Sequence, residues 1–345
     1  MSELVRKSVQ WCARCAVALF SACTVLITIG YKIGPEVAWP LALLQYFPHI
    51  YLLPPALVTV ALSFTLGRVW RVVSTCSLAL FVVYVMGLAL NTGETGERRI
   101  RLMTYNVKGY LATDTPDGIS PIAREIALHG ADIIVLQDAR EITAMLLEAP
   151  EMERQLFGSR QLYMYGQYLV ASRYPLRDCS PKSISFREQP HTYVHCIVDV
   201  NGSEVDLFGV HFVTPRHGLN SIRHDRLRGI SEWRQNIADR MVQANGLARE
   251  LRASLRPVIV AGDLNAPQNS LVIRTLLESG VRNAFSTAGV GFGYTYGHAH
   301  GYGISFMRID HVLVGSGIGV ADCFVGGKLG STHRALVADL LLGNR

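Results

Sequence analysis

Charge is scarce in the first part of this 345-residue chain. Residues 15–90 are almost free of charged side chains, and Asp, Glu, Lys and Arg make up 17% of the whole sequence, below the roughly 25% typical of soluble domains. The shortage argues against an ordinary soluble domain there. After Glu97 the composition becomes that of a globular domain. We therefore place a boundary in the polar stretch 91–99 and expect two parts, residues 1–95 and 96–345.

Metal-binding cysteine patterns and internal repeats are also absent from the sequence. None of the seven cysteines has metal-ligand spacing, so a cysteine-based zinc site is excluded. Cys179 and Cys196 lie on neighbouring predicted strands, where they either pair in an oxidising compartment or remain free. The lack of a repeat or a low-complexity tract excludes a repeat protein.

Excess positive charge is small in the larger part of the chain. Of the formal net charge of +6, residues up to Arg99 supply +4 (eight Lys/Arg against four Asp/Glu) and the rest +2 (twenty-five against twenty-three). A nucleic-acid-binding protein usually concentrates positive charge on its functional domain, so nucleic acid is the less favoured partner. The larger part has 22 Arg and 3 Lys. This bias reflects either bidentate phosphate contacts or genomic base composition.

Three long apolar runs take the place of charge near the N-terminus. Each approaches or exceeds the roughly 20 residues that a helix needs to cross a membrane. The middle run contains Pro48, Pro54 and Pro55, which predict a kink or a re-entrant start. The alternative, one cleaved signal peptide before a hydrophobic core, lacks a clear cleavage site. We expect a bundle of about three transmembrane helices, near residues 15–33, 41–66 and 72–90.

Basic residues beside these runs predict the orientation in the membrane. The N-terminal tail has three basic residues and the second short loop has Arg68 and Arg71, whereas the first loop has only Lys32. The positive-inside rule places the tail and the second loop in the cytoplasm. Three spans then make this a multi-pass protein of the cell (inner) membrane with its larger part extracytoplasmic. Arg98 and Arg99, after the last run, argue against this orientation.

Strand and helix patterns alternate after the boundary, which predicts an α/β fold. Helices are expected over residues 120–129 and 222–255. The turn Asn201-Gly202 predicts a hairpin between two strands. The expected strands are 100–107, 132–136, 168–172, 192–200, 204–210, 257–261, 309–314 and 336–342.

Polar side chains stand at or just beyond the ends of these strands. Strand ends of one sheet converge, so these side chains are expected to meet in one cleft. Hard cations such as Mg²⁺ bind carboxylate and amide oxygens, and two histidines beside such a metal suit in-line attack on phosphorus. The residues are Asn106, Gln137, Asp138, His211, Asp263, Asn265, Asp310, His311 and His333.

The motifs that contain these residues resemble those of the endonuclease/exonuclease/phosphatase superfamily in order and spacing. That superfamily includes deoxyribonuclease I, abasic endonucleases, neutral sphingomyelinases and inositol-phosphate phosphatases. The resemblance covers residues 100–342 and implies a four-layer α/β/β/α sandwich, with two packed β-sheets flanked by helices. Each motif alone is weak, whereas six in order are specific. They are TYNV at 104–107, DIIVLQD at 132–138, VH at 210–211, AGDLN at 261–265, RIDH at 308–311 and STH at 331–333.

The resemblance implies roles for the metal-binding and central residues. Asn106 and Asp138 would help hold the metal, Mg²⁺ or Mn²⁺. Asp263 would orient or deprotonate the attacking water, and Asn265 would contact the phosphate in the transition state. Read alone, Asp263 and Asn265 would instead cap a helix that begins near Pro267.

The resemblance also assigns the residues around the phosphate. His333, paired with Asp310, would bind or protonate a phosphate oxygen. His211 would polarise the phosphate or assist the leaving group. Arg140 and Thr295 match positions that contact the substrate in some members.

Two positions depart from the family pattern. Asp138 stands where Glu is usual, and Thr332 stands where Asp is usual. The loss of a carboxylate at Thr332 removes negative charge near the metal, so either metal affinity falls or a second metal is lost. The basic cluster 216–228 is either a solvated helix face or a rim that attracts anionic headgroups.

Together these observations predict a membrane-anchored, metal-dependent phosphoesterase. Its expected substrate is a phosphate ester or diphosphate of a lipid, because the short tether keeps the cleft near the bilayer. Some bacterial members with a similar layout are linked with cell-envelope lipid diphosphates. The expected partners are the lipid bilayer and a phosphorylated lipid, and no protein partner is predicted. The alternatives are an extracytoplasmic nuclease and a catalytically silent domain that binds headgroups or a partner.

Overall fold

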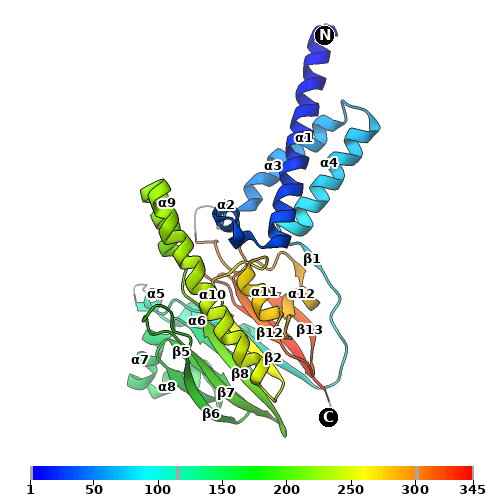
Figure 1. Cartoon of the computed structure of the whole chain (residues 1–345). Coiled ribbons are helices and arrows are strands. Elements are labelled where there is room, and N and C mark those ends of the chain that lie inside the picture. Colours follow the sequence, from blue (N-terminus) through cyan, green and yellow to red (C-terminus); the bar gives the residue numbers. More distant parts are fainter. Residues whose placement is uncertain (1–2, 114–116, 300–302, 344–345) are drawn as a thin grey trace. The chain divides into compact units, whose positions relative to one another are not determined.

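The computed structural model describes residues 3–113, 117–299 and 303–343, which form two compact units, Met1–Leu88 and Ala89–Arg345 (Figure 1). The first unit is helical throughout. Two of its helical stretches, Glu3–Ile33 and Arg68–Val85, are long and apolar enough to cross a membrane. Its elements are α1 (Glu3–Ile33), η1 (Pro35–Val37), α2 (Trp39–Leu44), η2 (His49–Leu52), α3 (Leu53–Ser63), α4 (Arg68–Leu80) and the π-turn η3 (Phe81–Val85).

The expected middle span over residues 41–66 is not one helix. Helix α2 ends at Leu44, and the next helical stretch runs only from His49 to Ser63. At 1.5 Å per residue, that stretch falls short of the roughly 30 Å hydrocarbon core. Pro48 explains the break, because proline lacks an N–H and disfavours helix at the residue before it. The third run also ends earlier than expected, at Val85, and Leu90 lies in a strand.

The second unit contains two mixed six-stranded sheets, which confirms the α/β fold. One sheet has the order β10-β12-β9-β8-β7-β6 and the other β13-β14-β2-β3-β5-β4. Strands β2 and β3 are parallel, as are β8 and β9, and the remaining neighbours are antiparallel. A separate pair joins β1 to β11. The strands are β1 (Ala89–Leu90), β2 (Arg99–Asn106), β3 (Ile133–Gln137), β4 (Gln161–Tyr165), β5 (Tyr168–Ser172), β6 (Leu176–Ser183), β7 (Thr192–Val200), β8 (Ser203–His211), β9 (Val258–Asp263), β10 (Arg282–Asn283), β11 (Val290–Gly291), β12 (Asp310–Val314), β13 (Ile318–Val325) and β14 (Leu336–Leu342).

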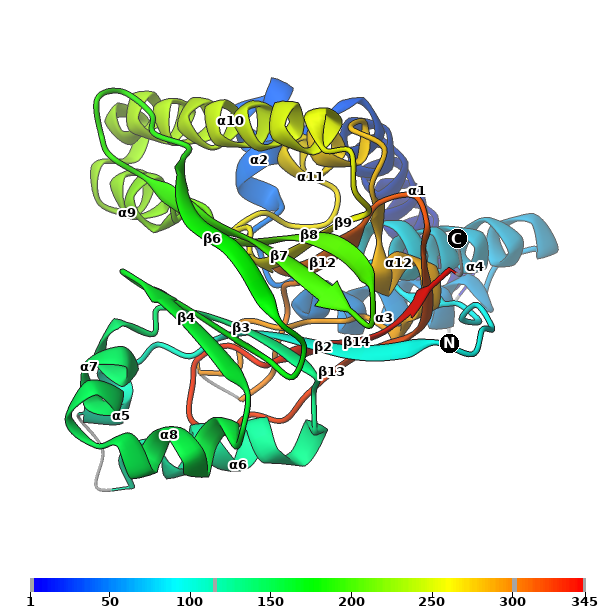
Figure 2. The same ribbon diagram turned by 90° about the horizontal axis from the view of Figure 1, so that it is seen from below.

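Helices cover the outer face of each sheet, so the unit has four layers (Figure 2). One core lies between the sheets and contains Leu102 and Ile259. A second core packs β2 and β3 against α6, α7 and α8, and a third packs β8 and β9 against α10 and α11. The helices are α5 (Tyr110–Thr113), α6 (Ser120–His129), α7 (Arg140–Glu148), α8 (Pro150–Phe157), α9 (Arg216–Asp225), η4 (Arg226–Gly229), α10 (Ile230–Ala253), α11 (Leu271–Leu277) and α12 (Ala284–Ala288).

The expected helix over residues 222–255 is interrupted. The chain turns back at Arg226, whose φ is 52°, so that α9 and α10 form a helical hairpin joined by η4. At Gly229 the two arms nearly touch, because a Cβ there would lie 2.3 Å from the carbonyl carbon of Ser221. Helical periodicity in the sequence does not reveal this break, since it continues on both sides.

Local sequence signals explain other turns. Asn201 and Gly202 have φ of 51° and 86° and join β7 to β8, which confirms the expected hairpin. Gly130 ends α6 in the left-handed conformation with φ of 56°. Ser270 caps α11, because its Oγ accepts a hydrogen bond from the N–H of Ile273 at 3.2 Å.

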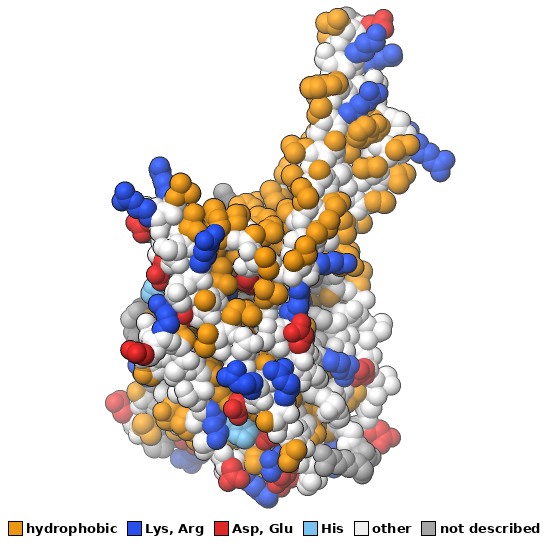
Figure 3. Space-filling view, in the orientation of Figure 1, with side chains coloured by type: hydrophobic (Ala, Val, Ile, Leu, Met, Phe, Trp, Pro, Cys, Tyr) orange, Lys and Arg blue, Asp and Glu red, His pale blue; other side chains and the backbone are white. Residues whose placement is uncertain are grey.

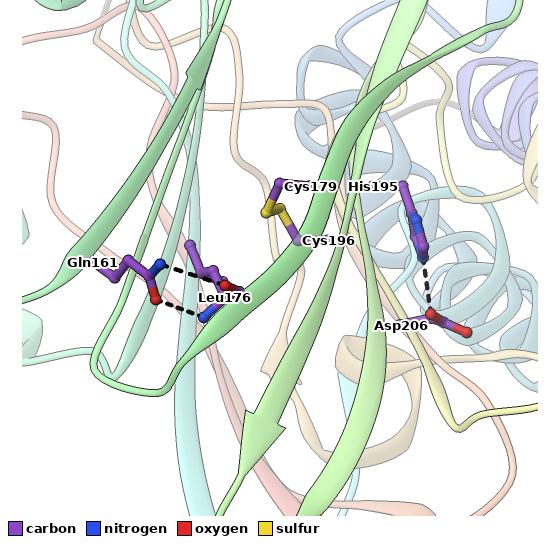
Figure 4. The surroundings of a disulfide bond; sticks show 6 residues. All are labelled: Gln161, Leu176, Cys179, His195, Cys196 and Asp206. Atoms are coloured by element: carbon purple, nitrogen blue, oxygen red, sulfur yellow. Dashed lines mark hydrogen bonds and ion pairs between the residues drawn. A yellow bond between two sulfur atoms is a disulfide. The ribbon is translucent and has the colours of Figure 1, made fainter.

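A disulfide joins Cys179 of β6 to Cys196 of β7, which answers the question that the sequence left open (Figure 4). Their Cα atoms are 4.1 Å apart, at the point where the β6–β7 register shifts. Nearby, the Gln161 side chain links the two sheets, because its Oε1 accepts from the N–H of Leu176 at 2.7 Å. The edge strands β4 and β6 are thus held together.

Candidate active site

Sheet register places three polar residues in a row at one end of the core between the sheets. Asp263, the last residue of β9, pairs with His211 of β8 on one side and with Asp310 of β12 on the other. These residues continue the alternation that turns Ile259 and other apolar side chains inward. Asn106, at the end of β2, has the same inward parity as Leu102 in the facing sheet. Polar side chains from both sheets therefore meet where the apolar core ends.

Asp263 is the centre of the cluster. Its Oδ2 accepts a hydrogen bond from Asn106 Nδ2 at 2.9 Å, and its Oδ1 accepts from the Asn265 N–H at 2.9 Å. The Nε2 atoms of His211 and His333 lie 3.5 and 3.7 Å from the same Oδ2. Asp263 is 1% exposed, so these neighbours replace water around its carboxylate.

His333 and Asp310 form a buried pair. His333 Nδ1 lies 3.0 Å from Asp310 Oδ2, and the two residues are 2% and 0% exposed. Burial lowers the pKa of His333, but the carboxylates of Asp310 and Asp263 outweigh it, so the pKa is raised above its ordinary value. The Ser331 hydroxyl accepts from the His333 N–H at 3.1 Å and holds the loop that carries the imidazole.

His211 is oriented by a glutamine from the β4–β5 turn. Its Nδ1 lies 2.6 Å from Gln167 Oε1, and because an amide oxygen only accepts, Nδ1 carries the proton. The Tyr168 hydroxyl accepts from the His211 N–H at 3.1 Å and donates to the Thr192 carbonyl at 2.7 Å. These contacts direct His211 Nε2 toward Asp263.

Asp138 lies on the more open side of the cluster, with its side chain 24% exposed. Its Oδ1 is 3.6 Å from His211 Nδ1, and its Oδ2 accepts a hydrogen bond from the Lys108 ammonium. Burial raises the pKa of Asp138, but the neighbouring His211 and Lys108 outweigh it and lower that pKa. The carboxylate is therefore charged at neutral pH.

Three residues of the site have left-handed backbone conformations. The φ values are 48° for Lys108, 50° for Asp138 and 48° for Asn265. Such conformations cost on the order of 1–3 kcal/mol each outside glycine and persist where the surrounding contacts compensate. Asn265 is held by its Nδ2, which donates to the Phe212 carbonyl at 2.8 Å, and by the buried Arg240 guanidinium, which donates to the Asn265 carbonyl at 3.3 Å.

The two expected substrate contacts, Arg140 and Thr295, differ in exposure. Arg140 is exposed at the start of α7 and forms no hydrogen bond or ion pair within the described part of the chain. Thr295 is fully buried, and its Oγ1 accepts from the N–H groups of Ile309 and Asp310 at 3.3 Å. It therefore supports the start of β12 and offers no exposed hydroxyl. The simpler role of Asp263 as a helix cap is wrong, because the next helix begins only at Leu271.

His311 has a structural environment. It is fully buried, with Nε2 2.9 Å from the Ala266 carbonyl and Nδ1 3.0 Å from Asn283 Nδ2. Burial lowers its pKa to about 4, so the imidazole is neutral and both ring nitrogens are satisfied.

Lys108, Gln167 and Tyr168 were not identified from the sequence. Lys108 directly follows the TYNV motif, so its position was a usable signal. Gln167 and Tyr168 had no such signal, because they reach His211 from 43 and 44 residues away in the sequence.

The donor set of the cluster fits a divalent cation. One ligand atom each from Asp263, Asp310 and His333 lies within 4.8 Å of the others. Asp310 Oδ1 is buried and has no hydrogen-bond partner among the residues that the structure describes. A buried carboxylate oxygen without a donor is costly unless a cation or water satisfies it. The oxygens of Asn106 and Asp138 add the hard ligands that Mg²⁺ or Mn²⁺ prefers.

Comparison with known proteins agrees with this geometry. A family model described as "Endonuclease/Exonuclease/phosphatase family" matches residues 103–333. A search of curated proteins found no match.

Solved structures share the fold at low identity. An endonuclease/exonuclease/phosphatase from Beutenbergia cavernae is 20% identical, with 72% of each chain covered and a TM-score of 0.53. One from Bacteroides vulgatus is 17% identical, with 72% of this chain and 100% of that chain covered and a TM-score of 0.53. D. rerio TDP2 complexed with single strand DNA product is 13% identical, with 71% and 99% covered and a TM-score of 0.53.

Proposed function

The chain belongs to the endonuclease/exonuclease/phosphatase family, and from this premise we propose that it is a membrane-anchored phosphoesterase. It hydrolyses a phosphate ester or diphosphate of a lipid with the help of Mg²⁺ or Mn²⁺. The observation that carries the proposal is the convergence of Asn106, His211 and His333 on the single carboxylate of Asp263, with Asp310 paired to His333.

A bound divalent cation supplies charge neutralisation on the phosphate oxygens. Asn106 and Asp138 would hold it, whereas Asp263, Asp310 and His333, which could also surround a cation, are assigned to the attacking water and the phosphate. Asp263 orients the attacking water as a hydrogen-bond acceptor. Its own position is held by Asn106 and by the N–H of Asn265. Asn265 would contact the phosphate in the transition state, and its Nδ2 donates to the Phe212 carbonyl at 2.8 Å, which fixes the amide beside Asp263.

The two histidines act on the phosphate and the leaving group. The carboxylates of Asp310 and Asp263 raise the pKa of His333, which favours its protonated form, and the protonated imidazole would donate a hydrogen bond to a phosphate oxygen. Asp310 is a positioning residue that fixes the His333 ring and stabilises its charge. His211 Nε2 lies 3.5 Å from Asp263 Oδ2 and its ring is held by Gln167 at Nδ1, so His211 would polarise the phosphate or assist the leaving group.

The lipid substrate and the outward orientation rest on two observations. The first unit has two helices long and apolar enough to cross a membrane, and the unit that holds the site follows it directly in the sequence. A lipid substrate fits this connection. The Cys179–Cys196 disulfide favours an oxidising compartment, because disulfides persist there and are rare in the cytosol. Two spans alone would return the second unit to the side of the N-terminal tail. The outward orientation therefore requires the broken segment α2–α3 to cross as well.

Labelling of whole cells tests this orientation. Leu255 is 95% exposed in the second unit and is replaced by cysteine in a chain whose Cys12, Cys15, Cys23 and Cys76 are serine. A membrane-impermeant thiol reagent should modify the new cysteine in intact cells. Modification only after lysis would place the second unit in the cytoplasm and contradict the proposal.

The activity itself is tested with the full chain in detergent micelles. With Mg²⁺ or Mn²⁺ added, the protein is given a polyprenyl diphosphate, a phosphodiester lipid and duplex DNA. Cleavage of a lipid substrate is expected, and Asp263→Ala should abolish it. Asp322→Asn, a change at an exposed acid on β13, is the matched control and should retain activity. Cleavage of DNA alone would refute the lipid proposal, and cleavage of nothing would favour a silent binding domain.

A nuclease is the second candidate, because D. rerio TDP2 complexed with single strand DNA product has the same fold. The larger part of the chain carries a net charge of only +2, which gives little support for a phosphate-tracking surface. A nuclease would show activity that falls steeply with salt, whereas hydrolysis of a lipid in a neutral micelle would depend on salt weakly.

A further inference from the structure

The helical hairpin of α9, η4 and α10 is a surface that the proposed chemistry does not use. Its base is firmly attached beside the candidate active site, because Asn236 donates to the Thr214 carbonyl at 2.9 Å and Gly218 packs closely on Trp233. Helix α9 begins at Arg216, five residues after His211. The hairpin therefore forms a rigid arm that starts next to the cluster and ends at η4.

Four arginines of this arm have no acidic partner in the part of the chain that the structure describes. Arg216, Arg223, Arg226 and Arg228 are exposed, and their guanidinium groups form no hydrogen bond or ion pair within the described ranges. Between residues 216 and 228 Asp225 is the sole acid in the sequence, so the four arginines leave a net charge of +3.

Some arginines of the same unit differ from these. Arg177, Arg187, Arg256 and Arg282 each form an ion pair with a carboxylate. Arg140 is exposed and, among the described residues, unpaired like the arginines of the arm, so what distinguishes the arm is that four such arginines lie within residues 216–228, around one exposed leucine.

An apolar side chain stands at the tip of the arm. Leu227 is 77% exposed and lies between Arg226 and Arg228 in η4. Figure 3 shows basic side chains together with hydrophobic ones at the end of α9. Moving an exposed leucine from water into an apolar medium is favourable. The neighbouring cations can meanwhile remain at a polar, anionic boundary.

We propose that the η4 tip docks onto the surface of an anionic phospholipid bilayer. Leu227 enters the boundary between headgroups and acyl chains, and Arg223, Arg226 and Arg228 bind headgroup phosphates, which guanidinium groups contact with two parallel hydrogen bonds. Nucleic acid fits this tip less well, because duplex DNA offers no apolar medium for Leu227 and the tip has no aromatic side chain for stacking. The proposal depends on the proposed function only in its choice of lipid as partner.

The docking also has a consequence for the cleft. Since the arm begins next to His211, its attachment to headgroups would hold the candidate active site near phosphorylated lipids. Each arginine close to an anionic leaflet strengthens binding roughly fivefold, so the three tip arginines together contribute roughly a hundredfold.

The test measures the surroundings of residue 227 in the full chain without any turnover. In a chain whose Cys12, Cys15, Cys23 and Cys76 are serine, Leu227→Cys is labelled with a nitrobenzoxadiazole fluorophore. The labelled chain is placed in nanodiscs of phosphatidylcholine alone or mixed with phosphatidylglycerol. Leu255→Cys, 95% exposed just beyond the other end of α10, carries the same label as the matched control.

We expect emission from residue 227 to move to shorter wavelength in the anionic nanodiscs and to stay unchanged in neutral ones. Residue 255 should show no shift in either. The shift should be lost with Arg226→Glu and Arg228→Glu or in high salt, while the melting temperature and hydrolysis of a soluble phosphodiester stay unchanged. A shift that is absent at 227, or equal at 227 and 255, would overturn the proposal. So would binding of duplex DNA to the labelled tip as tightly as the anionic nanodisc. Because the readout is independent of catalysis, an inactive protein with a normal shift would contradict only the proposed function.

Discussion

Replacing Asp310 by asparagine tests the role of the buried His333–Asp310 pair most directly. The amide oxygen of asparagine can still accept a hydrogen bond from His333 Nδ1, now 3.0 Å from Asp310 Oδ2, so the ring keeps its orientation. The change removes the negative charge from a partner that is 0% exposed. Hydrogen bonds to charged groups contribute roughly 1.5–3 kcal/mol, about 1 kcal/mol more than neutral ones. Because the amide still accepts the hydrogen bond, only this difference of about 1 kcal/mol is lost, and kcat should fall roughly fivefold.

The same variant makes a prediction about pH. Asp310 and Asp263 together raise the pKa of His333 against the effect of burial. Loss of the Asp310 charge should lower that pKa. If His333 acts in its protonated form, activity falls as pH rises through its pKa, so this alkaline limb of the kcat profile should move to lower pH in Asp310→Asn.

The assay follows hydrolysis of the preferred phosphate ester by the full chain over a range of pH, with Mg²⁺ present. Asp322→Asn serves as the matched exposed change, and thermal melting checks that each variant is folded. Unchanged kcat with an unshifted alkaline limb would refute the assigned role of the pair. A fall in kcat without a shift of the limb would show that Asp310 acts through geometry and not through charge on His333.

Three further changes test the packing and bonding that support the site. Gly262→Ala should destabilise the protein by about 1–3 kcal/mol or more in thermal melting, because a Cβ there would lie 1.8 Å from the Val210 carbonyl oxygen on the neighbouring strand. Glu125→Gln should cost roughly 1–3 kcal/mol at pH 7, since the buried carboxylate accepts from the Gly327 N–H at 2.5 Å. Burial opposes the charged form of Glu125, but hydrogen bonds from His129 and Gly327 lower its pKa below the usual 4.5. The stabilisation by the charged carboxylate is therefore fully present above pH 4.5. It is lost as the pH falls through the lower pKa of the folded state. Cys196→Ser should cost about 3 kcal/mol, as expected for a disulfide that spans 17 residues.

Each of these changes has its own control. Gly246→Ala lies inside α10, where the nearest atom to a new Cβ is 3.8 Å away, so it should be neutral or slightly stabilising; an equal loss at both glycines would contradict the clash at Gly262. For Glu125→Gln, a stability difference that stays constant down to pH 3 would exclude the proton linkage. A reducing agent should lower the melting temperature of the wild type and leave Cys196→Ser unchanged.

The sequence by itself identified candidate residues for the site but not the contacts between them. Polar residues stand at the ends of strands: Asn106, Asp138, His211, Asp263 and Asp310. Because successive side chains of a strand point to opposite faces of the sheet, the sequence also indicates on which face each side chain lies. The Asn-Gly turn determined one hairpin because it favours a left-handed backbone. Such signals are local, and they were sufficient for the α/β fold.

Contacts between distant segments were decided only in the tertiary structure. The register that sets Asp263 between His211 and Asp310 arises from strand pairing across fifty residues, which no local pattern encodes. The same holds for the contact of Gln167 with His211 and for the exposure of Arg140, which packing around α7 decides.

The two breaks within periodic segments differed in their sequence signal. Prolines predicted a kink in the middle apolar run, where the helix is interrupted at Pro48, whereas helical spacing continues through Arg226, where the chain turns back. Periodicity indicates which face of a helix or strand is buried. Packing against other parts of the chain determines where the helix ends or the chain reverses direction. Long-range packing therefore decided the shape of the arm, whereas short-range patterning had already predicted the α/β fold and marked the break in the second run.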